Sequence, residues 1–268
     1  MPPAVAPRPR NHLQRKNRKG SPSAPKDWPH IIYGKNPVYE ALKAGQRGVT
    51  EILLADDPKK LADSPILQLA RSKNVAVKHK SIHDLNHLTH NAVHQNIAAR
   101  VKNFPDYTLN QIFEDQAEQK LVLILDCIQD PQNFGTLCRS ALAFGVKEVI
   151  VPKDRSAQIT PTVCKASAGA VEHLKIIFVT NLARALEELK QQGFWVYGAS
   201  LVDKSMSLQK VDPAPKTALV LGSEGKGLRR LVADTCDQLI KIPMAGDFDS
   251  LNVAQAGSVI LYDFGRKI

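Results

Sequence analysis

Six apolar runs rich in β-branched residues alternate with helix-like segments in the second half of the chain. The runs cover residues 120–126, 147–152, 174–179, 194–199, 217–222 and 238–243. The helix-like segments include residues 134–144, 181–192 and 251–264. Strands that are apolar along their whole length are typical of a parallel sheet that helices cover on both faces. The pattern therefore predicts an α/β domain over residues 120–268.

A smaller α/β unit is expected before this domain. The pair Asn36-Pro37 is typical of a helix start, Gly45 is typical of a helix stop, and residues 65–73 favour a second helix. Strand-like runs cover residues 51–55, 75–79 and 97–101. The following segment is polar and contains a proline, so it is predicted to be a linker with a short helix. We therefore expect a small domain at 30–102 and a linker at 103–119.

The first 29 residues differ from the rest of the chain in composition and charge. They contain seven prolines, and seven Lys and Arg residues against a single Asp, whereas the whole chain has a net charge of +10 and a pI near 9.4. Almost no apolar periodicity is present, so residues 1–29 are predicted to be disordered. A solvated tail that only improves solubility is one interpretation. We favour an arm that contacts RNA, because a basic tail suits a polyanionic partner.

The composition also bears on compartment. No apolar run approaches the length of a transmembrane helix, and the N-terminus lacks the apolar region of a signal peptide. The four cysteines form no CxxC pair: Cys127, Cys138, Cys164 and Cys236. This spacing argues against a disulfide framework or a structural zinc site. We therefore expect a cytoplasmic protein with no membrane partner.

A group of histidines near helical spacing is the one pattern that suggests a metal. Its members are His79, His83, His87, His90 and His94. Asp84 is the only carboxylate nearby, and no cysteine accompanies the histidines. A solvated or partly buried helix face is the simpler interpretation, so no metal is expected.

Three blocks of compact polar residues each follow one of the apolar runs. The first contains Asn133 and Arg139, the second is the glycine loop of LGSEGKGL, and the third ends in SLN. Taken singly, Asn133 suits a turn, Arg139 an exposed helix, and Ser250 and Asn252 helix caps. Because the carboxyl ends of parallel strands meet at one edge of a sheet, the three blocks are predicted to form one ligand site.

The glycine loop matches neither GxGxxG nor GxxxxGK[ST], so a dinucleotide or a phosphate-binding loop is disfavoured. Glu224 in the turn would also repel a phosphate. A ligand with a positive centre or a hydroxyl-rich ribose is more compatible with this loop.

Together, DPQNFGTLCRSA, LGSEGKGLRRL and IPMAGDFDSLNVAQA resemble the three motifs of the SpoU (TrmH-like) branch of the SPOUT RNA 2′-O-methyltransferases. The order and spacing of the three make the match far more specific than any single motif. The first domain, with IIYGKNPVYEAL and HQNIAARV, is similar to the RNA-binding domain that resembles ribosomal protein L30e. This pairing resembles that of the bacterial 23S ribosomal RNA guanosine-2′-O-methyltransferases. One departure is Asn96, where those proteins usually have glycine after His-Gln.

The resemblance implies a set of site residues. Its catalytic positions are Asn133, Arg139, Glu224, Ser250 and Asn252. Its positions for the cofactor S-adenosylmethionine are Leu221, Gly222, Gly225, Ile242, Pro243, Met244 and Leu251. The resemblance also implies a deep trefoil knot and a homodimer, in which Arg139 could serve the partner's site.

The function expected from the resemblance is methylation of a ribose 2′-hydroxyl, most simply of a guanosine in 23S ribosomal RNA. A transfer-RNA ribose methyltransferase is the alternative within the family. A catalytically idle RNA-binding assembly factor is the alternative outside the enzyme class, and it is disfavoured because Asn133, Arg139 and Asn252 are all present. A nucleotide-dependent dehydrogenase is a further alternative, and it is disfavoured because the GxGxxG signature of such enzymes is absent from the sequence.

Overall fold

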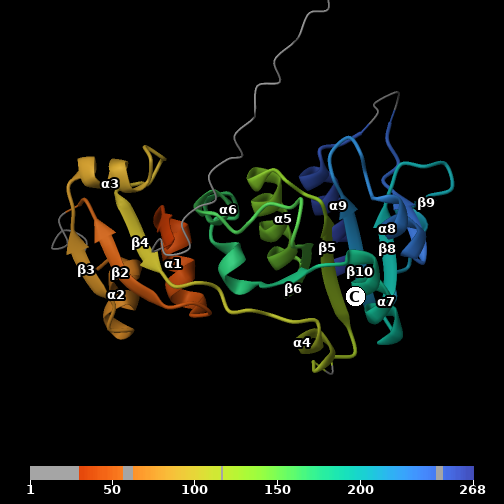
Figure 1. The fold of residues 1–268 in the computed structure, drawn as a ribbon, viewed down its shortest axis with the longest axis horizontal. Coiled ribbons are helices and arrows are strands. Elements are labelled where there is room, and N and C mark those ends of the chain that lie inside the picture. The colour runs from red at the N-terminus through yellow and green to blue at the C-terminus, as the bar shows by residue number, and fades with distance from the viewer. Residues whose placement is uncertain (1–29, 57–62, 116, 246–249) are drawn as a thin grey trace, which may run out of the picture.

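The chain folds around two β-sheets that lie side by side along its long axis (Figure 1). The structure is a computed structural model that describes residues 30–56, 63–115, 117–245 and 250–268. The predicted disorder of residues 1–29 lies outside the described residues. Among those that are described, no helix is long and apolar enough to cross a membrane.

The first sheet has four strands in the order β1-β4-β2-β3. Its strands are β1 (His30–Tyr33), β2 (Val49–Leu54), β3 (Ala76–His79) and β4 (Ile97–Val101). Its helices are α1 (Lys35–Ala44), α2 (Pro65–Ser72) and α3 (Ile82–Leu88). β4 runs antiparallel to both β1 and β2, while β2 and β3 are parallel. Successive residues of β2 therefore face opposite helices, with Ile52 and Leu54 in the core under α1 and α2, and Leu53 against Leu85 of α3.

The second sheet has seven strands in the order β7-β6-β5-β10-β8-β11-β9. They are β5 (Lys120–Asp126), β6 (Glu148–Pro152), β7 (Lys175–Val179), β8 (Trp195–Ala199), β9 (Met206–Ser207), β10 (Lys216–Gly222) and β11 (Gln238–Lys241). Every pairing in this sheet is parallel, as predicted. The six apolar runs of the sequence correspond to six of the strands, and the two-residue β9 is an addition. The trefoil knot stays a prediction.

Helices cover both faces of the second sheet, which confirms the predicted layering. The longer ones are α5 (Pro131–Ala143), α7 (Leu182–Gln191) and α9 (Val253–Gly265). The shorter ones are α4 (Asn110–Phe113), α6 (Pro161–Ala166), η1 (Ala170–His173), η2 (Leu208–Lys210) and α8 (Arg230–Thr235). On β5, Leu123 and Leu125 lie in the same core as α5 and α9, whereas Val122 and Ile124 lie with α7 and α8. Each such buried side chain stabilises the fold by about 1.5–3 kcal/mol.

A buried ion pair joins the two halves of the molecule. Arg47, which follows α1, donates from Nε to Glu172 Oε2 at 2.8 Å and from Nη2 to Glu172 Oε1. Both side chains are almost fully buried, at 4% and 1% exposed. The Arg47 guanidinium also lies 4.0 Å from the ring centre of Phe104 in the linker. A second contact joins His173 to Glu40 at 2.7 Å. The first sheet is therefore held against α6 and η1, besides being connected through the linker.

Replacing Arg47 tests how strongly this ion pair holds the fold. Arg47→Met leaves the Glu172 carboxylate buried without its partner, so we expect the free energy of unfolding to fall by about 3–5 kcal/mol. The measurement is urea denaturation of the purified protein. Adding Glu172→Leu to the same variant removes the orphaned charge and should recover much of the loss.

The matched control is Arg184→Met. Arg184 pairs with Glu188 at 3.0 Å within α7, but the two side chains are 80% and 36% exposed. Loss of such a surface pair should cost at most about 0.5 kcal/mol. Equal losses for the Arg47 and Arg184 variants would contradict a dominant role for the buried pair.

Candidate active site

The three polar blocks of the sequence meet at one edge of the seven-stranded sheet. β5 and β10 are parallel neighbours, and their last residues, Asp126 and Gly222, are directly paired. The loop after β5 leads into α5, the glycine loop follows β10, and the segment after β11 leads into α9. The carboxyl ends of these strands therefore bring the blocks together, as the parallel sheet requires.

Three of the predicted residues form a hydrogen-bonded cluster at this edge. Asn252 Nδ2 donates to Asn133 Oδ1 at 3.1 Å and to Glu224 Oε1 at 3.3 Å. Asn133 Nδ2 donates to Glu224 Oε2 at 3.4 Å. One residue from each block is therefore in direct contact with the other two.

Helix capping sets the positions of both asparagines. Asp130 caps α5 by accepting hydrogen bonds from the backbone N–H groups of Gln132 and Asn133, so Asn133 lies in the first turn. Asn252 is the N-cap of α9, and its Oδ1 accepts from the backbone N–H of Ala254 at 2.9 Å. The amide oxygen of Asn252 thus caps the helix, as predicted, while its NH₂ group binds the cluster. Its catalytic role stays a prediction.

The glycine loop closes tightly on the end of β10. Ser223 and Gly227 exchange two backbone hydrogen bonds, of 3.1 and 2.9 Å. A Cβ atom on Gly222 would lie 2.2 Å from the carbonyl carbon of Gly227. Gly225 has a positive φ of 76°, a conformation that glycine adopts at little cost. Gly222 is therefore required by close backbone contact, and Gly225 by its dihedral angle.

Asp126 fixes the far end of the same loop. This fully buried carboxylate accepts from the backbone N–H of Arg229 at 2.8 Å and from Arg229 Nε at 2.6 Å. None of the sequence motifs indicates this role of Asp126, although a carboxylate that ends an apolar strand is a usable signal. The next residue, Cys127, has a positive φ of 62°. Burial, with the charge of Asp126, raises the pKa of the Cys127 thiol, so it stays protonated and is a poor nucleophile.

A cavity of about 570 Å³ opens beside the cluster, between the ends of β8, β10 and β11 and the start of α9. Of the predicted residues, those that line it are Leu221, Gly222, Glu224, Gly225, Ile242, Met244, Ser250 and Leu251. Pro243 is exposed and does not line the cavity. Asn133 and Asn252 are not in its wall either, but both bind Glu224, which is. The cavity is mostly apolar, and its charged lining residues are Glu224, Lys226 and Lys241.

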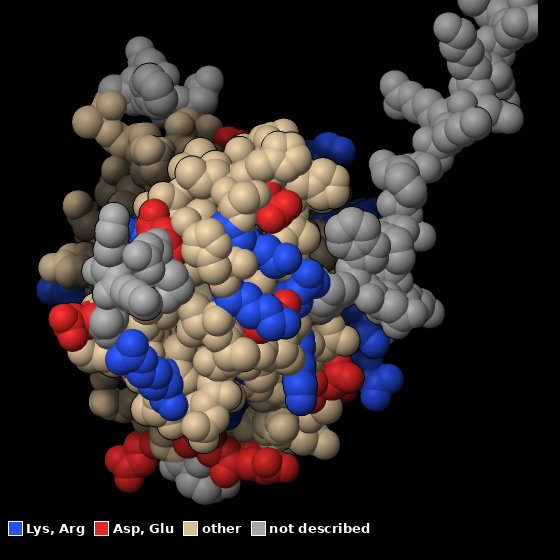
Figure 2. Space-filling view, turned by 90° about the vertical axis from the view of Figure 1, so that its left-hand side faces the viewer, with Lys and Arg blue, Asp and Glu red and all other residues tan. Residues whose placement is uncertain are grey.

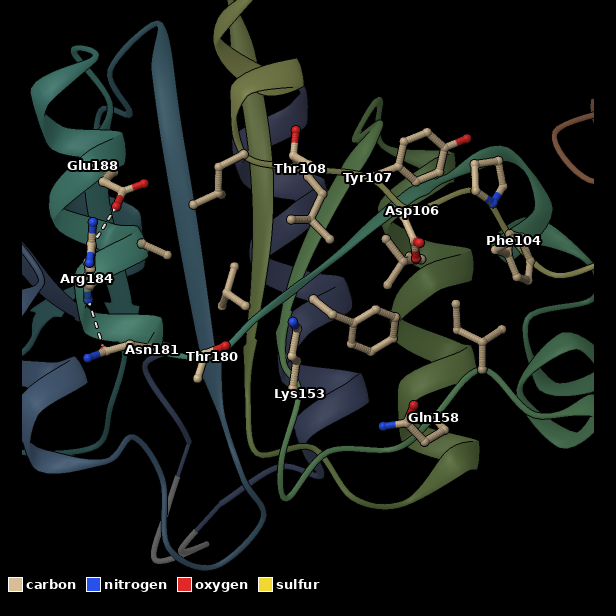
Figure 3. Close-up of a pocket in the computed structure, with 18 of the residues that line it drawn as sticks. Phe104, Asp106, Tyr107, Thr108, Lys153, Gln158, Thr180, Asn181, Arg184 and Glu188 are labelled. Carbon is tan, nitrogen blue, oxygen red and sulfur yellow. Dashed lines mark hydrogen bonds and ion pairs between the residues drawn. The ribbon is translucent and has the colours of Figure 1, made fainter. Parts of the chain in front are cut away.

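A larger hollow of about 1030 Å³ lies elsewhere, between the linker and β7 (Figure 3). Figure 3 shows Tyr107 and Thr108 on one side, with Lys153 and Arg184 on the others. Arg184 is paired with Glu188 there, and none of the three polar blocks contributes to the lining. The smaller cavity is therefore the candidate site, because the polar blocks and the glycine loop converge on it.

Of the predicted catalytic residues, Arg139 is the one that belongs neither to the cluster nor to the cavity wall. It is exposed on α5, six residues after Asn133, which places it about 9 Å further along the helix axis. It makes no hydrogen bond or ion pair with any residue that the structure describes. Within this chain Arg139 therefore lies outside the cluster, and its catalytic role stays a prediction.

The histidine-rich segment contains no metal centre in the part of the chain that the structure describes, where no group of three or more His, Cys, Asp or Glu side chains converges. His94 is buried, and its Nε2 lies 2.9 Å from Asn86 Oδ1. All four cysteines are free thiols.

Comparison with known proteins identifies the family. The SpoU rRNA Methylase family model matches residues 120–262, more than half of the chain. The chain belongs to this family. It is a SpoU-type RNA methyltransferase, and its first domain matches the RNA 2′-O ribose methyltransferase substrate-binding model over residues 31–107.

Similar proteins support the same assignment. A TrmH family tRNA/rRNA methyltransferase of Staphylococcus aureus (strain COL) is 40% identical over 240 residues, which are 88% of this chain and 96% of that protein. A TrmH family protein of Bacillus subtilis is 37% identical and covers 88% and 95%. The SpoU methyltransferase AviRb from Streptomyces viridochromogenes, solved in complex with the cofactor AdoMet, shares the fold with a TM-score of 0.73, 23% identity, and 88% and 89% coverage.

A glycine substitution tests the loop geometry. In Gly222→Ala the new Cβ collides with backbone rather than with a flexible side chain, so the loop must shift. We expect this variant to lose more than about 2 kcal/mol of stability, in the range of overpacked sites. The control is Gly225→Ala, where a Cβ meets nothing within 4 Å and only the left-handed dihedral is penalised, by about 1–2 kcal/mol. Thermal unfolding of both variants would refute the close-contact explanation if Gly222→Ala were the milder change.

Proposed function

We propose that this enzyme transfers the methyl group of S-adenosylmethionine to a ribose 2′-hydroxyl, most simply of a guanosine, in 23S ribosomal RNA. The observation that carries the proposal is the Asn133–Glu224–Asn252 cluster at the rim of the glycine-loop cavity. Family membership supports the methyl transfer, and the AdoMet bound to AviRb supports the choice of cofactor.

The apolar walls of the cavity and the Glu224 carboxylate support S-adenosylmethionine as the ligand. Ile242, Met244 and Leu251 offer apolar walls for an adenosyl group, and the glycine loop lines the same cavity. Glu224 contributes a carboxylate, which disfavours a phosphate but tolerates a positively charged sulfonium. When bound, the cofactor supplies an electrophilic methyl group. The task left to the protein is to align the attacking oxygen and to manage one proton.

In this proposal Asn133, Glu224, Ser250 and Asn252 position the ribose. Arg139 stabilises the developing alkoxide or orients a nearby phosphate, and the proton leaves to phosphate or water. Arginine remains charged in proteins, so Arg139 is not assigned the role of a base.

In a homodimer, Arg139 could contribute to the active site of the partner subunit. Within this chain Arg139 is remote from the cluster, on a pair of packed helices whose surface is partly apolar. On α9, Val259 is 43% exposed and Tyr262 is 58% exposed. Exposed apolar side chains on a helix that packs against the one carrying Arg139 suit a protein interface. We therefore propose that two copies associate through α5 and α9, and that Arg139 reaches the partner's site.

The first domain and the basic tail would hold the RNA. The substrate-binding family model covers this domain, and Figure 2 shows Lys and Arg side chains gathered across the middle of its outer face. A 2′-hydroxyl distinguishes RNA from DNA, and specific recognition of RNA usually targets unpaired nucleotides. With ribosomal RNA as its substrate, the enzyme would act in the cytoplasm.

Transfer RNA is the alternative substrate. A TrmH/SpoU tRNA modifying enzyme of A. aeolicus has a TM-score of 0.51 and 28% identity, but covers only 59% of this chain and 83% of its own. Ribosomal RNA is favoured because this chain has an additional domain of the substrate-binding type.

Labelled methyl transfer tests the function directly. We expect tritium from S-adenosylmethionine to enter ribosomal RNA at a ribose 2′-oxygen, and we expect transfer RNA to remain unlabelled. Mapping of 2′-O-methyl sites with and without the protein then identifies the nucleotide. Absence of label in every RNA tested, from a protein that binds the cofactor, would show the proposal to be wrong.

The variant Asn252→Asp distinguishes the role of Asn252 in the cluster from its role as a helix cap. Aspartate caps a helix as well as asparagine does, so the stability of α9 should be kept. The new carboxylate cannot donate to Asn133 and repels Glu224, so kcat/KM should fall about ten- to a hundredfold, equivalent to about 1.4–2.7 kcal/mol. The measurements are the initial rate of methyl transfer and thermal unfolding. Full activity in this variant would remove the role given to the cluster.

A further inference from the structure

A cavity of about 430 Å³ lies in the first domain, where four of its segments meet. They are the start of α1, the end of β2, the start of α2 and the turn that precedes β4. Two backbone hydrogen bonds hold these segments together, from Ala55 N–H to the carbonyl of Asn96 at 2.9 Å and from Gly34 N–H to the carbonyl of Ile97 at 3.0 Å. Ligand pockets commonly measure about 300–1,000 Å³, so this cavity has room for a nucleobase.

The lining of this cavity is mostly apolar and includes an aromatic ring. Leu54, Leu67 and Ile97 belong to the buried core and also line the cavity. Tyr39 of α1, which is half-buried, contributes its ring to the wall. Proteins that bind unpaired nucleotides stack the bases on aromatic side chains of this kind. The lining therefore suits a flat aromatic ligand.

Two polar side chains in the wall keep hydrogen-bonding capacity. Asp56 Oδ1 accepts from Asn96 Nδ2 at 3.0 Å, whereas Asp56 Oδ2 has no partner among the described residues. Gln95 Oε1 accepts from the backbone N–H of Lys35 at 3.1 Å and from Lys165 Nζ at 3.0 Å, so Nε2 is the group that remains to donate. The wall thus offers a carboxylate acceptor and an amide donor.

The turn that carries Gln95 is strained and is held in one shape. Gln95 and Asn96 have positive φ values of 54° and 64°, which non-glycine residues rarely adopt. His94 Nδ1 accepts from the backbone N–H of Asn96 at 3.1 Å, and the side chain of Asn96 in turn orients Asp56. A glycine at position 96 would suit the turn but would leave the carboxylate without this donor. Backbone strain of this kind is concentrated at ligand sites.

We infer that this cavity takes one unpaired guanine base of the RNA substrate, bound by Asp56 and Gln95 and stacked on Tyr39. The Watson–Crick edge of guanine presents the acceptor O6 beside two N–H donors, N1–H and N2–H. Gln95 Nε2 matches the acceptor, and the Asp56 carboxylate matches the two donors. Adenine, cytosine and uracil do not present two adjacent N–H donors on this edge. The same carboxylate disfavours a phosphate as the ligand.

This inference rests on the proposed function, and it adds a nucleotide other than the methylated one. The lining residues fall between Lys35 and Ile97, in the first domain, whereas the catalytic cluster lies in the second. The first domain matches the substrate-binding family model over residues 31–107. Because Lys165 of α6 bonds to Gln95, the cavity adjoins the junction between the domains. A guanine bound here would set which nucleotide of the same strand reaches the cluster.

Binding of short RNAs to the unchanged protein tests the base preference. The probes are fluorescent uridine ten-mers with one central guanosine, inosine, adenosine or uridine, and anisotropy gives the affinities at one salt concentration. We expect the guanosine probe to bind about ten- to a hundredfold more tightly than the adenosine and uridine probes. Inosine, which lacks the N2 amino group, should fall in between. Equal affinities for the four probes, or no measurable binding of any, would overturn the inference.

Asp56→Asn tests the carboxylate. The amide oxygen still accepts from Asn96, so thermal stability should be kept, but the new NH₂ group opposes the donors of guanine. The preference for the guanosine probe should therefore be lost. The matched control is Asp63→Asn, which makes the same charge change at an exposed residue outside the cavity wall. Removal of a negative charge by itself strengthens binding of every probe. Identical shifts in guanosine affinity for the two variants would contradict the role of Asp56.

Two substitutions of Tyr39 test the stacking. Tyr39→Phe keeps the ring, so its affinity for the guanosine probe should stay near that of the unchanged protein. Tyr39→Leu removes the ring and should weaken binding of this probe by about tenfold or more. Thermal unfolding checks that both variants are folded. If the Leu variant binds the guanosine probe as tightly as the Phe variant does, Tyr39 does not stack on the base.

The two proposals fail in distinguishable ways. If the unchanged protein transfers no methyl group to any RNA, the proposed function is wrong. If it methylates RNA but does not discriminate among the four ten-mers, only the guanine cavity is wrong. In the active enzyme, Asp56→Asn should raise the KM for RNA more than it lowers kcat, because the base is bound away from the reacting atoms.

Discussion

The site depends on a single amide group, that of Asn252. Its oxygen caps α9 and its nitrogen donates to both Asn133 and Glu224, so one side chain joins the start of a helix to the other two polar blocks. These contacts span 119 and 28 residues of sequence. The glycine loop can hold Glu224 in position only because Gly222 admits the backbone of Gly227 and Asp126 anchors Arg229. Cavity, cluster and helix start are therefore one cooperative unit.

Much of the fold could be predicted from local pattern. Six strands of the second sheet and its three long helices follow from apolar runs and their spacing, and the capped start of α9 from Asn252. Short elements, whose sequences carry only a weak periodic pattern, were not predicted. β1 has only four residues, α6 and α8 have six each, and β9 has two. Their formation depends on contacts with residues that are distant in the sequence, and short-range periodicity does not reveal such contacts.

The convergence of the three polar blocks was predictable from the sequence, but their detailed geometry was predictable only in part. The parallel sheet explains why Asn133, Glu224 and Asn252 meet, since their blocks follow strands that end at one edge. It did not reveal that Arg139 stands apart, because that depends on which side of α5 faces the cluster. Nor did it reveal the roles of Asp126 and Arg47. Each becomes important only through a partner more than 100 positions away, at Arg229 and Glu172.

The ion pair between Arg47 and Glu172 makes the two domains poorly exchangeable. Each domain carries one half of a buried charge pair, and only the other domain neutralises it. A substrate-binding domain from another methyltransferase, attached through the same linker, would bury Glu172 against whatever side chain it presented. Acquisition of a new RNA target by recombination of whole domains is thus disfavoured. Specificity would evolve more easily by substitution on the exposed surface of the first domain, with the junction kept unchanged.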